Sequence, residues 1–189
     1  MSKMIVVDEK FVDEMKSLTV DEAIEIFSKG VFVNHNDDDR PLYGFTSKAL
    51  RLIGDKGAVW VLASNEIPKE RKEVIEYNIA SWYCWNRYPK VFPKAAAYVA
   101  RNGHDEAKMI FIGACNTEIW LDVSLNASEE VMMALLNQLE KRVTGLRGNY
   151  NYEGEVKEEI DELKMLARSI SLRDGLSDEI REMAKYAAL

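Results

Sequence analysis

Apolar residues recur at helical spacing towards both ends of the chain. Phe11, Met15 and Leu18 follow one another at intervals of four and three, which predicts a helix over 8–18. A capping-box pattern predicts a second helix over 19–29. Three further helices are predicted in the C-terminal third of the chain. The first is capped by Asn126 or Ser128, runs to Thr144 and stops at Gly145, the second covers 153–173, and the third is capped by Ser177 and runs to 189.

Short apolar runs separated by turn residues fill the middle of the chain. The runs over 58–63, 108–114 and 117–123 have the length and composition of strands, and a further short strand is predicted over 31–33. The run over 95–101 fits either a helix or a hairpin strand before an Asn-Gly turn, and the strand is favoured.

Two helices are predicted between these strands. The first covers 46–53 and ends at Gly54. The second covers 68–88, begins with a proline that suits the first turn, and ends at Pro89. The acidic stretch over 34–41 is predicted to be a loop.

These elements predict an α+β fold. Strands cluster in the middle of the chain and helices fill both ends, which indicates a mostly antiparallel sheet of four or five strands flanked by N-terminal and C-terminal helices. A length of 189 residues predicts a single domain over 1–189. Its helical segment over 153–189 either packs on the rest of that domain or forms an interface.

Composition indicates a soluble, acidic, cytoplasmic protein. The net charge of −7 argues against strong nucleic-acid or membrane binding, although residues 41–110 hold 11 basic against 7 acidic residues. No signal peptide or apolar stretch of membrane-spanning length is recognised. The two cysteines, Cys84 and Cys115, lack a CxxC partner and are expected to be buried thiols, so no metal and no cofactor is predicted.

One candidate catalytic site combines the two histidines of the chain with an acidic loop. His35, Asp37 and His104 would form an acid–base site for a small or phosphorylated substrate, together with Arg40, if the fold brings both histidines together. The alternative is that the Asp37–Asp39 loop and His104 lie in solvated turns. The loop lacks the glycine and glutamate of an EF-hand, and whether it holds a metal stays open.

A candidate ligand-binding site lies on the basic, aromatic end of the second mid-chain helix. Tryptophan and tyrosine rings there would stack on a base while cations grip a phosphate. The alternative is that the rings pack the core and the cations face water. The residues of this site are Trp82, Trp85, Arg87, Tyr88 and Lys90, with Lys94 nearby.

A candidate interface follows from apolar residues spaced four and three apart in the helix over 153–173. This heptad seam either packs against the preceding helix through Leu135, Leu139 and Val143, or meets a second chain. Its residues are Val156, Ile160, Leu163, Ala167 and Ile170.

The sequence favours a non-enzymatic, acidic interaction or regulatory protein, with an inhibitor-like role. The expected partner is another protein or a second copy in a homodimer, because acidic helical segments with apolar seams lie at both ends of the chain. The alternatives are a small enzyme using the His/Asp loop and a nucleotide or nucleic-acid binder using the aromatic helix. No motif of the chain resembles a known family.

Overall fold

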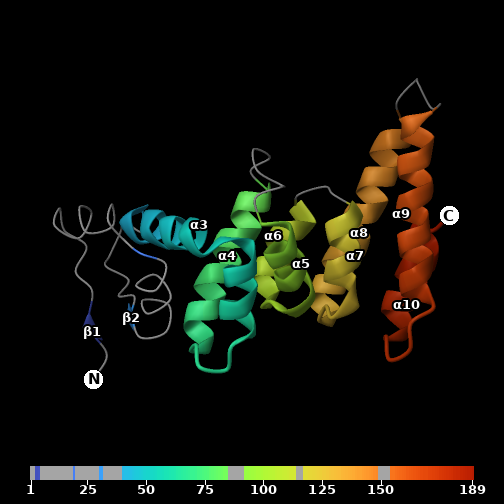
Figure 1. Cartoon of the computed structure of the whole chain (residues 1–189). Coiled ribbons are helices and arrows are strands. Elements are labelled where there is room, and N and C mark those ends of the chain that lie inside the picture. Colours follow the sequence, from blue (N-terminus) through green and yellow to red (C-terminus); the bar gives the residue numbers. More distant parts are fainter. Residues whose placement is uncertain are drawn as a thin grey trace. The chain divides into compact units, whose positions relative to one another are not determined.

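The computed structural model describes a predominantly helical chain (Figure 1). The residues described are 3–4, 19, 30–31, 40–84, 92–113, 117–148 and 154–189. Within them, β1 (Lys3–Met4) and β2 (Gly30–Val31) form a short parallel pair. The helices of these ranges are α3 (Arg40–Ala63), α4 (Lys69–Cys84), α5 (Pro93–Asn102), α6 (Asp105–Gly113), α7 (Thr117–Leu125), α8 (Glu129–Arg147), α9 (Glu155–Ser171) and α10 (Asp178–Ala187).

The prediction of an α+β fold with an antiparallel sheet is therefore wrong. Four segments predicted or favoured as strands are helical where they are described. They are 58–63 in α3, 95–101 in α5, 108–114 in α6 and 117–123 in α7. Short apolar runs of this kind occur in strands and in buried helices alike, and their spacing alone does not separate the two.

The burial pattern of α7 shows why its run is helical. Ile119, Trp120 and Val123 are buried at intervals of one and three, and Leu121 between them is exposed. The Trp120 indole Nε1–H donates to the carbonyl oxygens of Phe111 and Ile112, both at 3.1 Å. These carbonyls belong to the last turn of α6, where the helix itself supplies no further N–H donors. The Trp120 side chain of α7 provides a donor to both of them.

A glycine divides α3 into two helical parts. Gly54 has φ 68° and ψ −178°, a conformation that residues with a Cβ rarely adopt. The predicted end of a helix at Gly54 is confirmed, but the chain becomes helical again directly afterwards. Beyond the kink, Ala58, Val61 and Leu62 are buried and Trp60 is exposed, which is a helical pattern.

The carboxylate that follows this kink caps α5. Asp55 Oδ1 accepts from the N–H of Ala95 at 2.8 Å, and Asp55 Oδ2 accepts from the N–H of Lys94 at 3.1 Å. Pro93, at the first position of α5, has no N–H to satisfy. A carboxylate from a distant segment thus caps the N-terminus of a short helix. This cap stabilises the helical conformation of 93–102.

The chain divides into two compact units, Met1–Val99 and Ala100–Leu189, with the boundary inside α5. In the first, α3 contacts α4. In the second, α8 contacts α6, α7, α9 and α10. The expectation of a single domain over 1–189 stays a prediction.

The three helices predicted in the C-terminal third of the chain are observed as α8, α9 and α10. Two of their predicted N-terminal caps are observed as well. The Ser128 hydroxyl accepts from the N–H of Val131 and caps α8, and the Ser177 hydroxyl accepts from the N–H of Ile180 and caps α10. The predicted stop at Gly145 is wrong, because α8 continues to Arg147.

Several predictions fall outside the described part of the chain. These are the helices over 8–18 and 19–29, apart from Thr19, and most of the loop over 34–41, whose last two residues begin α3. Among the described helices, none has the length and the apolar composition that crossing a membrane requires.

Replacing the capping carboxylate tests the arrangement of α5. We expect Asp55→Ala to lower the free energy of unfolding by about 1 kcal/mol, because two N–H groups lose their acceptor. Asp55→Asn should have a smaller effect, since one amide oxygen can still accept. Urea denaturation followed by far-UV circular dichroism measures both, with Lys56→Ala at the exposed neighbouring position as the control. Equal effects at Asp55 and Lys56 would contradict the cap.

Candidate functional site

The histidine-based candidate is described only in part. His104 lies between α5 and α6, and its Nε2 is 4.0 Å from Glu106 Oε2. His35 and Asp37 lie outside the described residues, so their meeting with His104 stays a prediction. Within the described ranges, no three His, Cys, Asp or Glu side chains gather in a way that suits a metal ion.

The aromatic candidate site is also described in part. The half-buried Trp82 ring has the Arg51 guanidinium 5.6 Å from its centroid, and the Phe92 ring lies 5.5 Å away at an interplanar angle of 33°. These contacts tie α3, α4 and the start of α5 together within the first unit. The other residues of this candidate site, namely Trp85, Arg87, Tyr88 and Lys90, lie outside the described residues, so ligand binding there stays a prediction.

The heptad seam of α9 is directed into the second unit. Ile160, Leu163, Ala167 and Ile170 are buried, and Val156 is half-buried. The helix contacts α8 and α10, and Arg142 of α8 pairs with Glu159 of α9 at 2.7 Å. The seam thus packs within the chain in this structure, and its use as an interface stays a prediction.

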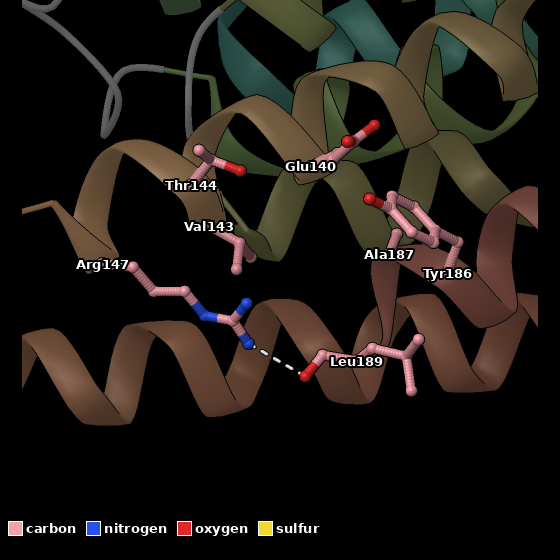
Figure 2. Close-up of a pocket in the computed structure, with 7 residues that line it drawn as sticks. All are labelled: Glu140, Val143, Thr144, Arg147, Tyr186, Ala187 and Leu189. Carbon is pink, nitrogen blue, oxygen red and sulfur yellow. Dashed lines mark hydrogen bonds between the residues drawn. The ribbon is translucent and has the colours of Figure 1, made fainter.

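A small pocket lies between α8 and the end of α10 (Figure 2). The guanidinium of Arg147 donates to the carbonyl oxygen of Leu189 at 2.9 Å, and Lys164 of α9 donates to the same oxygen. The cavity measures about 130 Å³, well below the roughly 300–1,000 Å³ of typical ligand sites. Because its arginine is already bonded and its volume is small, this pocket is a poor ligand site.

Polar contacts fasten both ends of the junction between α7 and α9. At one end, the Thr117 hydroxyl lies 3.5 Å from Glu162 Oε2. At the other end, Arg173 donates to the Ser124 hydroxyl at 2.9 Å and also to the Ser124 carbonyl oxygen. Partial burial lowers the pKa of the Arg173 guanidinium, but arginine stays charged at neutral pH. The cation therefore bonds to a carbonyl in the last turn of α7, where the helix dipole favours a positive charge.

Four large apolar side chains are exposed along this junction. Their exposed fractions are 48% for Leu121, 49% for Leu125, 67% for Met165 and 83% for Leu172. Leu121 and Leu125 follow Thr117 by four and eight residues, and Met165 follows Glu162 by three. Side chains at these intervals lie on the same side of a helix. Leu172 follows Met165 by seven residues and is the C-cap residue directly after α9. These four residues, called the α7–α9 face below, thus flank the junction from both sides.

Charged side chains surround this apolar strip unevenly. Glu118 of α7 and three carboxylates of α9 are exposed near the N-terminal ends of the two helices. We call these four residues, Glu118, Glu158, Asp161 and Glu162, the acidic rim. The cations nearby are Lys157, beside Glu158, and Arg168 and Arg173, towards the C-terminal end of α9, while Arg101 pairs with Asp122 of α7 at 2.7 Å. The α7–α9 face is therefore acidic at one end, apolar in the middle and more basic at the other end.

Sequence reasoning missed this face because it assigned α7 to a strand. As a strand, Leu121 shares a buried side with Ile119 and Val123. As a helix, Leu121 and Leu125 share a side that Ile119 and Val123 do not. On α9, Met165 is an apolar residue outside the heptad seam. Its position was the sequence feature that could have indicated an exposed apolar site.

Comparisons with protein families, with characterised proteins and with solved structures find no match to this chain.

Removing the guanidinium at the end of the junction tests how α7 is held against α9. We expect Arg173→Met to lower the free energy of unfolding by about 1–2 kcal/mol, because Ser124 loses a charged donor. A double-mutant cycle with Ser124→Ala should show a coupling of at least about 0.5 kcal/mol. Chemical denaturation measures all four proteins, with the exposed Arg168→Met as the matched control. Additive effects at Arg173 and Ser124 would contradict the contact.

Proposed function

We propose that this chain is a non-enzymatic interaction or regulatory protein and that it binds a partner protein through the α7–α9 face. The observation that carries the proposal is the gathering of Leu121, Leu125, Met165 and Leu172 along one helix junction while each stays 48–83% exposed. Single exposed apolar residues are ordinary on protein surfaces, but grouped ones mark sites where another molecule binds.

The residue types support a protein partner. Leucine and methionine offer non-directional apolar contact, and methionine adapts its shape to different partners. The polar contacts at both ends of the junction hold the two helices in place beneath this apolar strip. A fixed surface binds with a smaller loss of conformational freedom than a loose one.

The composition supports a place for this interaction in the cytoplasm. The chain is acidic, and it has only two cysteines and no paired cysteine motif. An acidic protein of this kind is suited to basic sites on its partners, including sites that otherwise hold nucleic acid.

Photo-crosslinking at single positions tests the proposal. A photoreactive benzophenone amino acid is placed at Leu172 on the face, or at Tyr77 on α4 as the control, since Tyr77 is 49% exposed and belongs to the first unit. In cells that naturally express the protein, we expect irradiation to join Leu172 variants to a discrete protein species. Mass spectrometry identifies the adduct, which is either another protein or a second copy of this chain.

The matched variant makes this experiment specific. Adding Met165→Glu to the chain that carries the photoreactive group at position 172 should reduce the adduct at least about tenfold, because a charge enters the apolar strip. The Tyr77 control should give no comparable species. Equal adducts at positions 172 and 77, or an adduct unchanged by Met165→Glu, would refute binding through this face.

A further inference from the structure

The α7–α9 face offers exposed apolar side chains from two helices that contact each other. Two packed helices present parallel rows of side chains with a valley between them, and a third helix fits such a valley by inserting its own ridges. Met165 and Leu172 are seven residues apart, which is two turns or about 11 Å. A partner helix with apolar residues at i, i+3 or i+4 and i+7 matches this length.

The charged residues around the face favour partner helices of one sign of charge over the other. The four carboxylates of the acidic rim outnumber the exposed Lys157 that lies among them, and of the two guanidinium groups farther along α9, Arg168 and Arg173, the second is bonded to Ser124. A helix with lysine and arginine beside its apolar stripe would meet favourable potential at the acidic end of the face. An acidic helix would meet like charge there.

The same charges disfavour two other occupants. Through the same face, a second copy of this chain would offer the four carboxylates of the acidic rim only Arg168 and Arg173, of which the latter is bonded to Ser124, so it complements the acidic rim less fully than a helix rich in lysine and arginine. An anionic lipid surface would be repelled by the same carboxylates. A basic partner is therefore the occupant that charge complementarity supports.

We propose that the α7–α9 face binds a basic amphipathic helix of a partner protein, with the partner's apolar stripe on Leu121, Leu125, Met165 and Leu172 and its cations on the acidic rim. This inference rests on the proposed function and specifies the chemistry of the partner.

Synthetic peptides of defined charge and apolar spacing test the inference directly. The probe is a peptide of about 18 residues, long enough to form a helix on its own. It carries leucine at i, i+3, i+4 and i+7 positions and lysine elsewhere. Two controls are the same peptide with glutamate in place of lysine, and a scrambled peptide of equal composition whose leucines surround the helix. Fluorescence anisotropy measures the affinity of each peptide for the full chain.

We expect the basic amphipathic peptide to bind at least about tenfold more tightly than either control, and its binding to weaken as salt is raised. Met165→Glu with Leu172→Glu should weaken it at least about tenfold, whereas Tyr77→Glu should leave it unchanged. Reversing two charges of the acidic rim, with Glu158→Lys and Asp161→Lys, should weaken binding and reduce its salt dependence, while leaving the Thr117–Glu162 contact in place. Carbodiimide crosslinking should join peptide lysines to Glu158 or Glu162.

Three outcomes would overturn the inference. They are equal binding of the scrambled peptide, equal or tighter binding of the acidic peptide, and binding that the Met165/Leu172 variant does not weaken. A photo-crosslink from Leu172 to a second copy, or to an acidic partner, would overturn it too while leaving the proposed function standing. Absence of any face-dependent photo-crosslink would instead refute the proposed function, so the two failures are distinguishable.

Discussion

The broad apolar surface of α8 is the constraint on which the second unit depends. Its buried residues are Val131, Met132, Leu135, Leu136, Leu139, Val143 and Leu146. They cover more than one side of the helix, so one neighbour cannot cover them, and α6, α7, α9 and α10 all contact it. Each neighbour turns its own apolar side towards this core. Apolar residues that this core does not bury remain exposed on the surface. They include Leu121, Leu125, Met165 and Leu172.

Side chains from distant parts of the chain stabilise the ends of the short helices. Helices of nine or ten residues such as α5, α6 and α7 are marginal on their own. Asp55 accepts hydrogen bonds from the N-terminus of α5. At the C-terminal end of α7, Lys108 donates to the carbonyl of Asn126 and Arg173 donates to Ser124. Each charge has the sign that the helix dipole favours. Tertiary contacts therefore determine the short helices.

This dependence explains which elements the sequence predicts well. The long helices α8 and α9 carry several turns of regular apolar spacing, and Ser128 and Ser177 are local caps that can be read from the chain. The segments 58–63, 95–101, 108–114 and 117–123 are too short for their periodicity to decide, and their helical state depends on partners such as Asp55, 40 residues from Ala95. Since the α7 side of the α7–α9 face requires α7 to be a helix, Leu121 and Leu125 could not be assigned to this face from the sequence. The seam of α9 was visible because it lies in a long helix.

The energetics of the face determine what kind of binding it supports. Full burial of a leucine or methionine contributes about 1.5–3 kcal/mol, so four such side chains, already partly buried, offer roughly 4–7 kcal/mol. Association itself costs about 4–15 kcal/mol. Apolar contact alone therefore leaves little net affinity, and the attraction between the acidic rim and a cationic partner has to supply the remainder. A complex of the proposed kind would form quickly, because rim charges raise the association rate, and it would weaken as salt is raised. Binding that is charge-selected and reversible is the behaviour that a regulatory protein requires.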